Sequence, residues 1–316
     1  MINLIGGSGF IGTSIVKKLI KSDSDFKILD IKKPNHEEYF YHTDVCEIST
    51  LRKNIAEDSI IINLAAEHKD NITPTTRYYD VNVEGAKNIC KIAEEKNVQT
   101  IIFTSSVAIY GFAKLDTNEQ GEINPFNDYG KSKYEAELIY KKWQEKDPYN
   151  RTLTVIRPTV VFGERNRGNV YNLLKQVHSK RFLKIGSGLN KKSIAYVENV
   201  SDFIIHSIEF TAKYNVYNYV DKPDITMNEL VDYTKDILSY NKNNQLRLPY
   251  HLALFCGFLI DILSKAVNKE FSISSIRIKK FCSSTTFSTS IEKSGFKPKV
   301  DIFQALKNTI LHEFDK

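Results

Sequence analysis

A tyrosine followed four residues later by a lysine occurs three times in this chain, at Tyr110/Lys114, Tyr129/Lys133 and Tyr171/Lys175. On a helix this spacing places the two side chains on one face, one turn apart. The ammonium can then lower the pKa of the phenol, so that the phenol can act as an acid or base near neutral pH. Only Tyr129 opens a long helical pattern, residues 129–143 (YGKSKYEAELIYKKW). Tyr129 and Lys133 are therefore the candidates for proton transfer.

Hydroxyl side chains follow the predicted strand that precedes this helix. The stretch IIFTSSVAIYG, residues 101–111, ends its apolar run with Thr104, Ser105 and Ser106. Ligands of open α/β sheets bind outside the carboxyl ends of the strands. A serine at this place could hydrogen-bond a reacting hydroxyl or carbonyl group, although each serine taken alone is more often a loop cap.

The glycine-rich stretch GGSGFIG, residues 6–12, lies between a predicted strand and a predicted helix. Glycines allow the tight turn that brings backbone N–H groups close to a pyrophosphate, and the helix N-terminus supplies partial positive charge. The predicted cofactor-binding residues of this loop are Gly6, Gly9, Phe10, Ile11 and Gly12.

Asp30 ends the second predicted strand, 18 residues after Gly12. This offset is typical of the carboxylate that accepts hydrogen bonds from the adenosine ribose. A carboxylate there would repel a 2′-phosphate, so the sequence favours NAD over NADP. Lys32 and Lys33 follow directly and could weaken that preference.

Strand and helix patterns alternate along the first half of the chain. Apolar runs without polar alternation predict strands at 2–5, 27–31, 60–64, 100–104 and 153–156, with helical patterns between them at 10–20, 82–96 and 129–143. This order predicts an α/β fold, a Rossmann-type doubly wound parallel sheet with a small, mostly helical C-terminal substrate lobe. We expect an NAD-binding domain at 1–165 and a substrate-binding lobe at 166–316, with a segment near 193–222 returning to the sheet.

Composition narrows the class of protein. The net charge of +6 comes without a dense basic block, which suits an anionic small molecule and argues against nucleic acid. The four cysteines have no metal or redox spacing, so we expect reduced thiols, no metal site and a cytoplasmic protein without a signal peptide. The apolar stretch 252–263 is too short to span a bilayer and predicts a buried or interfacial helix without stable membrane insertion.

Taken in order, these motifs resemble the extended short-chain dehydrogenase/reductase family. The matching segments are GGSGFIG, Asp30, NLAA at 63–66, FTSSVAIYG, YGKSK and the Arg157-Pro158 pair within IRPTVVFG. The likeness covers about residues 1–205 and is most similar to the NAD-dependent epimerase/dehydratase branch, which includes UDP-galactose 4-epimerases. It implies an enzyme that binds NAD and acts on the sugar of a sugar nucleotide.

The resemblance also implies roles for individual residues. Tyr129 would be the catalytic acid/base, Lys133 its partner on the nicotinamide ribose, and Ser106 the catalytic serine that contacts the substrate hydroxyl. Asp44 and Val45 would lie beside the adenine, and Ala65 and Ala66 along the cofactor. Lys192 matches the position of a diphosphate-binding arginine, and Asn169, Arg165 and Arg167 are further candidates for contact with the nucleotide.

The same segments bear on the reaction. The 4,6-dehydratases of this branch carry an acidic pair where this chain has Val107 and Ala108, which cannot transfer protons, so dehydration is disfavoured. We expect an epimerase acting at C4 of a UDP-hexose or UDP-N-acetylhexosamine through a 4-keto intermediate, in polysaccharide or lipopolysaccharide sugar biosynthesis. The alternatives are an NAD(P)H-dependent 4-ketoreductase of a UDP-4-keto-6-deoxy sugar and, more remotely, a cofactor sensor without activity. The second apolar faces of 82–96 and 129–143 predict a homodimer.

Overall fold

The computed structural model describes residues 1–69, 72–211, 213–240, 246–267 and 274–315. These residues divide into two compact units. The first unit comprises 1–161, 195–220 and 287–300, and the second comprises 162–194, 221–286 and 301–316. Each unit is therefore assembled from three separate stretches of the chain.

A seven-stranded parallel sheet forms the centre of the first unit, in the order β10-β6-β5-β4-β1-β2-β3. The strands are β1 (Ile2–Ile5), β2 (Phe26–Asp30), β3 (Phe40–His42), β4 (Ile60–Asn63), β5 (Thr100–Thr104), β6 (Thr152–Pro158) and β10 (Tyr214–Tyr219). The chain runs outward from β1 to β3 and then resumes on the other side of β1 with β4. This reversal of strand order creates the switch point at which such sheets bind ligands.

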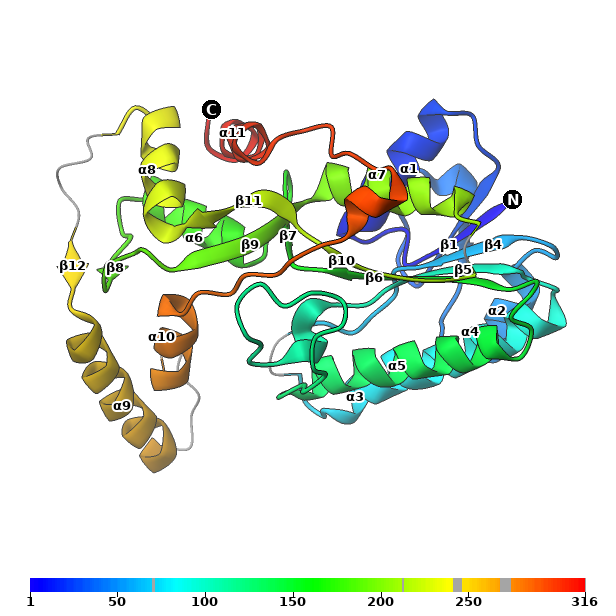
Figure 1. The fold of residues 1–316 in the computed structure, drawn as a ribbon, viewed down its shortest axis with the longest axis horizontal. Coiled ribbons are helices and arrows are strands. Elements are labelled where there is room, and N and C mark those ends of the chain that lie inside the picture. Colours follow the sequence, from blue (N-terminus) through cyan, green and yellow to red (C-terminus); the bar gives the residue numbers. More distant parts are fainter. Residues whose placement is uncertain (70–71, 212, 241–245, 268–273, 316) are drawn as a thin grey trace. The chain divides into compact units, whose positions relative to one another are not determined.

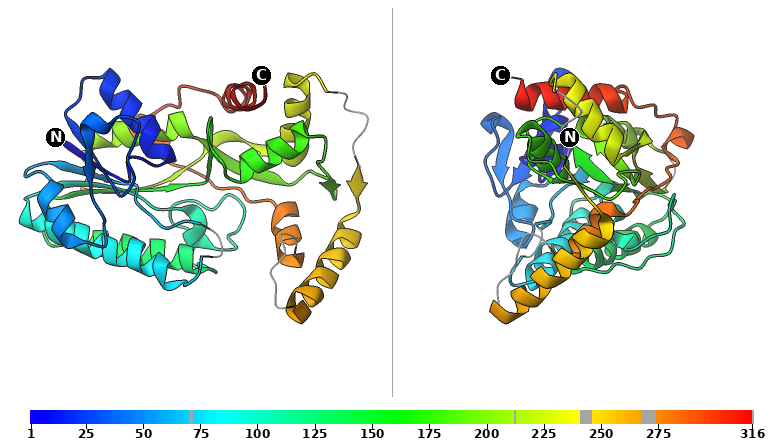
Figure 2. Two further views of the ribbon diagram at one scale, coloured as in Figure 1. Left: turned by 180° about the vertical axis from the view of Figure 1, so that it is seen from behind. Right: turned by 90° about the vertical axis from the view of Figure 1, so that its left-hand side faces the viewer.

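Helices cover both faces of the sheet (Figure 1, Figure 2). α1 (Phe10–Lys21) and α7 (Val197–His206) pack side by side on one face. On the other face lie α2 (Ile48–Asn54), α4 (Gly85–Glu95) and α5 (Asp128–Glu145), and the short α3 (Thr76–Tyr79) precedes a π-helical turn, η2 (Asp80–Glu84). The doubly wound parallel sheet predicted from the apolar runs is confirmed.

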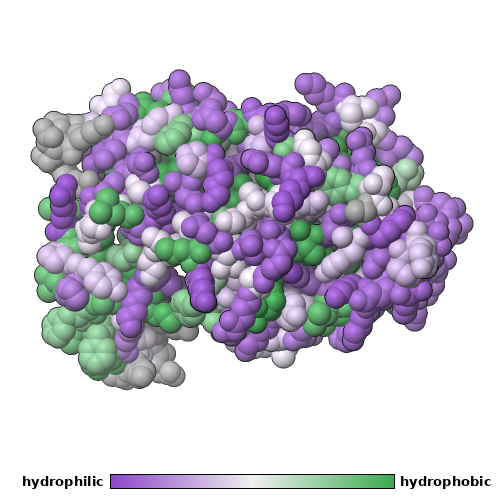
Figure 3. Space-filling model, viewed as in Figure 1, coloured by the Kyte–Doolittle hydropathy of each residue, from purple (hydrophilic) through white to green (hydrophobic). Residues whose placement is uncertain are grey.

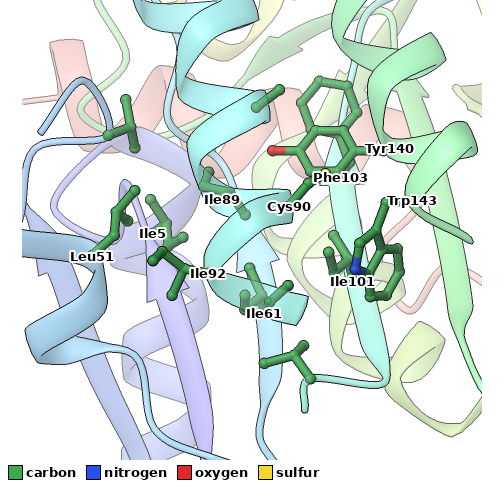
Figure 4. Packing of buried hydrophobic residues seen from close by; sticks show 14 of the residues in the cluster. Ile5, Leu51, Ile61, Ile89, Cys90, Ile92, Ile101, Phe103, Tyr140 and Trp143 are labelled. Atoms are coloured by element: carbon green, nitrogen blue, oxygen red, sulfur yellow. The ribbon is translucent and has the colours of Figure 1, made fainter. Parts of the chain in front are cut away.

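Alternate residues of each strand enter two different cores. Leu4 and Ile28 face α1 and α7, whereas the next residues along, Ile5 and Leu29, pack in the cluster under α2, α4 and α5. Figure 4 shows this second cluster, which contains Ile89, Ile92, Phe103, Tyr140 and Trp143. Because both faces are covered, the strands need apolar side chains on both sides, and this is why they lack polar alternation.

The second unit combines short strands with several helices. The chain enters it along β7 (Val160–Phe162), and β9 (Lys191–Tyr196) pairs antiparallel with β11 (Asp221–Thr226). β8 (Lys184–Ile185) pairs parallel with β12 (Arg247–Leu248). The helices are α6 (Asn169–His178), α8 (Met227–Ile237), α9 (Tyr250–Val267), α10 (Ser275–Cys282) and α11 (Ile302–Phe314).

A buried guanidinium group joins three elements of the first unit. Arg157 of β6 forms a bidentate ion pair with Glu137 of α5, with N–O distances of 3.0 and 2.6 Å. The same side chain donates to the hydroxyl of Tyr110, which in turn donates to Asn218 of β10. Tyr110 is the last residue of η3 (Val107–Tyr110), the turn that follows Ser106. Arg157 thus fixes α5, which carries Tyr129 and Lys133, against the segment that begins at Ser106.

This ion pair predicts a large effect of substitution. The Glu137 and Arg157 side chains are 4% and 7% exposed, so Arg157→Met leaves a buried carboxylate without its partner. We expect the free energy of unfolding, measured by urea titration, to fall by about 3–5 kcal/mol.

The double variant Glu137→Gln/Arg157→Met should lose less unfolding free energy than Arg157→Met, because it buries no unpaired charge. Arg52→Met is the matched control, since Arg52 also forms a bidentate pair, with Glu95, but both partners are more than a third exposed. Its substitution should change stability far less. Equal losses for Arg157→Met and Arg52→Met would contradict the role assigned to the buried pair.

Candidate active site

The glycine loop lies between β1 and α1 as the sequence predicts. Gly6 has a φ of +76°, and a Cβ there would approach the backbone nitrogen of Ala65 to 2.6 Å. A Cβ on Gly12 would approach the carbonyl oxygen of Gly7 to 2.5 Å. Side chains at these two positions are therefore excluded by backbone contact. Gly6 and Ala65, both predicted to bind the cofactor, are in direct contact.

The N-terminus of α1 is open for an anion. Its N-cap is Gly9, which has no side chain to occupy the first N–H groups, and its first turn contains no acidic residue. Phe10 and Ile11 are the first two residues of the helix. The backbone N–H groups and the positive end of the helix dipole are therefore available to a pyrophosphate.

The Asp30 carboxylate lies at this loop. One carboxylate oxygen accepts the N–H of Ser8, at 3.0 Å, and the other accepts the N–H of Lys32, also at 3.0 Å. The Ser8 hydroxyl donates to the carbonyl of Lys32, which ties the loop to the end of β2 a second time. The carboxylate is thus held beside the turn where a dinucleotide's adenosine ribose would meet the pyrophosphate.

The Asp44-Val45 segment is anchored to α4. A Cβ on Gly85 would lie 2.9 Å from a methyl group of Val45, and the Asn88 amide donates to the Val45 carbonyl. The Asp44 carboxylate accepts the N–H of Cys46. A dinucleotide requires a glycine loop, a carboxylate for the ribose and a segment beside the adenine. The loop 6–12, Asp30 and the Asp44-Val45 segment provide these features, so the residues present fit NAD.

Ser106 and Tyr129 belong to segments in close contact. The Ser106 hydroxyl accepts the N–H of Ala108 and thereby caps η3. A Cβ on Gly130 would approach the Ala108 carbonyl oxygen to 2.6 Å, so only a glycine after Tyr129 permits this approach of α5 to η3. The adjacent Thr104 and Ser105 hydroxyls are buried and lack a hydrogen-bond partner among the described residues. Polar groups therefore gather at the carboxyl end of β5.

Lys133 is buried one turn after Tyr129. Its side chain is 2% exposed, and its ammonium lies 4.4 Å from the centre of the Phe103 ring, over the end of β5. Burial lowers the pKa of Lys133 to about 7, and the Glu137 carboxylate partly offsets this. Lys133 is therefore a buried amine that titrates near neutral pH, one helical turn after Tyr129, the second residue of α5.

Asn82 is a buried residue that the sequence reasoning missed. Its amide accepts the N–H of Glu67 and donates both to the Glu67 carbonyl and to the Ser132 hydroxyl. The Ser132 hydroxyl donates to the carbonyl of Tyr129. Asn82 thus ties the chain just after Ala65-Ala66 to the first turn of α5. In the sequence, Asn82 stands between Val81 and Val83, and this pattern by itself indicates only the start of a helix.

The candidates for contact with the nucleotide lie in the second unit and have different partners there. The Lys192 ammonium donates to the carbonyls of Lys280 and Ser283 and to the Thr285 hydroxyl. Asn169 is the exposed first residue of α6. Arg167 pairs with Glu313 of α11, and the backbone N–H of Arg165 donates to the same carboxylate. Among the residues that the structure describes, no cluster of His, Cys, Asp or Glu could hold a metal ion.

Comparisons with known proteins show related sequences. The chain is 45% identical over 98% of its length to N-acetyl-α-D-glucosaminyl-diphospho-ditrans,octacis-undecaprenol 4-epimerase of Escherichia coli O157:H7, of which it covers 94%. It is 28% identical to the UDP-glucose 4-epimerase of Vibrio cholerae, over 73% of each chain.

Solved structures show the same fold. The UDP-glucose 4-epimerase of Thermotoga maritima matches 98% of this chain with a TM-score of 0.77 and 21% identity, over 97% of its own chain. The UDP-N-acetylglucosamine 4-epimerase of Methanobrevibacter ruminantium gives the same TM-score, identity and coverage. The profile of the NAD dependent epimerase/dehydratase family matches residues 2–219. The chain is therefore an enzyme that belongs to the NAD-dependent epimerase/dehydratase family.

Proposed function

We propose that the enzyme is a 4-epimerase of an N-acetylhexosamine that is carried on a polyprenyl diphosphate. The observation that carries this proposal is the 45% identity, over 98% of the chain, to an enzyme named for that reaction. The UDP-glucose 4-epimerase of Vibrio cholerae is 28% identical over a shorter span. A UDP-linked hexose or N-acetylhexosamine, the substrate expected from the sequence, is the second candidate.

The residues at the end of β5 suit proton transfer at the C4 hydroxyl of the sugar. Tyr129 would take the proton from O4 as C4 is oxidised to a ketone. It would return the proton after the keto sugar has rotated in the site and presents its opposite face. Ser106 would hydrogen-bond O4 in both steps. The glycine loop and Asp30 would hold NAD, which would supply reversible hydride transfer at C4. A positively charged Lys133, one turn along α5, would stabilise the phenolate form of Tyr129.

The alternatives differ in what the site must supply. A 4,6-dehydratase needs carboxyl groups after the catalytic serine, and η3 offers Val107 and Ala108 instead. A 4-ketoreductase would use the same tyrosine, lysine and serine with NAD(P)H, and we retain it as the alternative reaction. We also propose that the enzyme is a homodimer that serves polysaccharide biosynthesis, as the sequence led us to expect.

Substitution of Tyr129 tests the mechanism. Tyr129→Phe removes only the ionisable oxygen, so turnover should fall on the order of 10²–10⁴-fold while NAD binding is retained. The assay follows conversion of N-acetylglucosaminyl-diphospho-polyprenol in detergent to its 4-epimer, with UDP-N-acetylglucosamine in parallel.

Tyr171→Phe is the matched control, because Tyr171 also precedes a lysine by four residues but lies on α6 of the second unit. Its turnover should equal that of the wild type. Activity of Tyr129→Phe above about a tenth of the wild-type value would exclude Tyr129 as the acid/base. Turnover of the UDP-sugar without turnover of the lipid-linked sugar would contradict the proposal of a lipid-linked substrate.

The position of Asp30 predicts a preference for NAD. Protein that is freshly purified and then denatured should release NAD, as measured by mass spectrometry of the supernatant. Asp30→Asn keeps an acceptor for the Ser8 N–H but removes the charge that repels a 2′-phosphate, so its NADP affinity should rise about tenfold or more relative to NAD. Equal affinities of the wild type for the two dinucleotides would contradict this role of Asp30.

The burial of Lys133 predicts a pH-dependent stability of the nucleotide-free protein. Its pKa falls from 10.5 to about 7 on folding, so between these pH values the unfolded chain binds a proton that the folded chain has released. Burial of the Lys133 ammonium thus lowers the free energy of unfolding by its full amount below about pH 7. This destabilisation decreases as the pH rises toward 10.5. Lys133→Met should be more stable than the wild type by a few kcal/mol at pH 7 and by clearly less at pH 9.

Urea unfolding at both pH values measures this difference. Lys131→Met is the control, because Lys131 is exposed on the same turn of α5. Its stability relative to the wild type should not depend on pH. A Lys133→Met variant that is less stable than the wild type at pH 7 would contradict the burial of a titrating lysine.

A further inference from the structure

α9 exposes an apolar surface that is unusual for a protein in water. Seven large apolar side chains on this helix are each between 45% and 58% exposed; they are Leu252, Phe255, Phe258, Leu259, Ile262, Leu263 and Val267. Figure 3 shows the corresponding green area at the lower left, where Figure 1 places α9. Single exposed apolar residues are ordinary, but a contiguous patch of this kind marks an interaction site.

The other side of α9 is already used for packing. Ala253 and Gly257 are buried, and a Cβ on Gly257 would lie 2.7 Å from the Ile278 side chain and 3.0 Å from the Ser275 backbone of α10. The Asp261 carboxylate accepts the N–H of Ser275. The one acidic side chain of α9 therefore points toward the start of α10. The apolar face is therefore the outer face of an α9–α10 hairpin. The sequence allowed a buried or an interfacial helix, and the structure places the large side chains outward.

The charge of the hairpin is positive. α9 and α10 contain one acidic residue, Asp261, and four basic ones: Lys265, Arg277, Lys279 and Lys280. Lys279 and Lys280 are exposed on α10, as is the apolar Ile276. Apolar side chains beside lysines are the combination that binds the interface of a bilayer with anionic lipids. Among the described residues, no helix is long and apolar enough to cross a membrane.

We propose that the α9–α10 hairpin docks on the surface of an anionic lipid bilayer, with the outer face of α9 lying in the interface and α10 at the headgroups. This inference rests on the proposed function, because a polyprenyl-linked substrate is anchored in a bilayer. It extends that function by assigning the surface through which the enzyme reaches such a substrate.

A contact within the second unit supports this orientation. The Lys192 ammonium, our candidate for the substrate diphosphate, donates to the carbonyls of Lys280 and Ser283 at the C-terminal end of α10. The candidate diphosphate contact is therefore joined directly to the helix that we place at the headgroups. A diphosphate on a polyprenyl chain lies at that same level of the membrane, since the chain is apolar and the diphosphate is charged.

Vesicle sedimentation tests the docking independently of catalysis. The full-length protein is mixed with vesicles of phosphatidylethanolamine and phosphatidylglycerol, or of phosphatidylcholine alone. Wild type should bind the anionic vesicles, and Phe255→Glu/Leu259→Glu should weaken binding at least about tenfold. Lys279→Ala/Lys280→Ala should weaken binding to anionic vesicles by roughly fivefold per residue with little effect on phosphatidylcholine.

Leu115→Glu/Tyr149→Glu is the matched control, because both residues are more than half exposed in the first unit and the added charge is the same. It should bind like the wild type. Turnover of the lipid-linked sugar in detergent should be unchanged in Phe255→Glu/Leu259→Glu, whereas turnover in vesicles should fall with binding. This comparison separates failure of docking from failure of the proposed function, which would abolish turnover in both preparations.

Two outcomes would overturn the proposal. One is wild-type protein that turns over its substrate but stays in the supernatant with anionic vesicles. The other is light scattering that shows an oligomer of the wild type and a smaller mass for Phe255→Glu/Leu259→Glu, without vesicle binding by either protein. The face would then be a contact between copies of the chain.

Discussion

The arrangement of the candidate site depends on the buried Arg157 side chain. Buried N–H donors need partners, and a carboxylate, a phenol and a backbone carbonyl accept four hydrogen bonds from its guanidinium group at fixed geometry. These acceptors come from α5, from η3 and from the loop at Glu119, so the position of one side chain sets three segments at once. The segments that carry Tyr129, Lys133 and Ser106 are two of these three. A guanidinium group that was less buried would leave them freer to move.

Close backbone contacts complete this arrangement where side chains would take too much room. Gly130 brings the first turn of α5 onto η3, and Gly6 brings the end of β1 onto Ala65. The buried amide of Asn82 then links the Ala65 segment to α5 through Glu67 and Ser132. The glycine loop and the helix that carries the candidate acid/base, Tyr129, are therefore connected within one unit by the Gly6–Ala65 contact and the hydrogen bonds of Asn82. A precise site on a rigid scaffold is what hydride transfer at a carbon and proton transfer at its hydroxyl oxygen require.

The second unit shows a different physical solution. Its hairpin of α9 and α10 leaves large apolar side chains exposed. Their contact with water is unfavourable, and only contact with another apolar phase or surface would remove this free-energy cost. The first unit places its large apolar residues on both sides of the sheet, in the two buried clusters. The contrast indicates that the exposed face of α9 is matched to something other than the chain itself. The basic residues of α10 give that surface its electrostatic preference.

The sequence by itself determined the parallel sheet and the strand–glycine loop–helix order, and it supplied Asp30, Tyr129 and Lys133 as candidates, because each follows from local periodicity or from a short spacing. Strands buried on both faces must be apolar throughout, and a loop that approaches a neighbouring backbone must contain glycine, so both constraints appear in the residues themselves. The network around Arg157, the three bonds of Asn82 and the contacts of Lys192 with the C-terminal end of α10 join residues at least 15 positions apart. Their partners could not be chosen from the sequence, since many polar residues were equally available. The outward face of α9 was also decided only in three dimensions, because a helix that is apolar on nearly all sides carries no periodic signal of which side is covered.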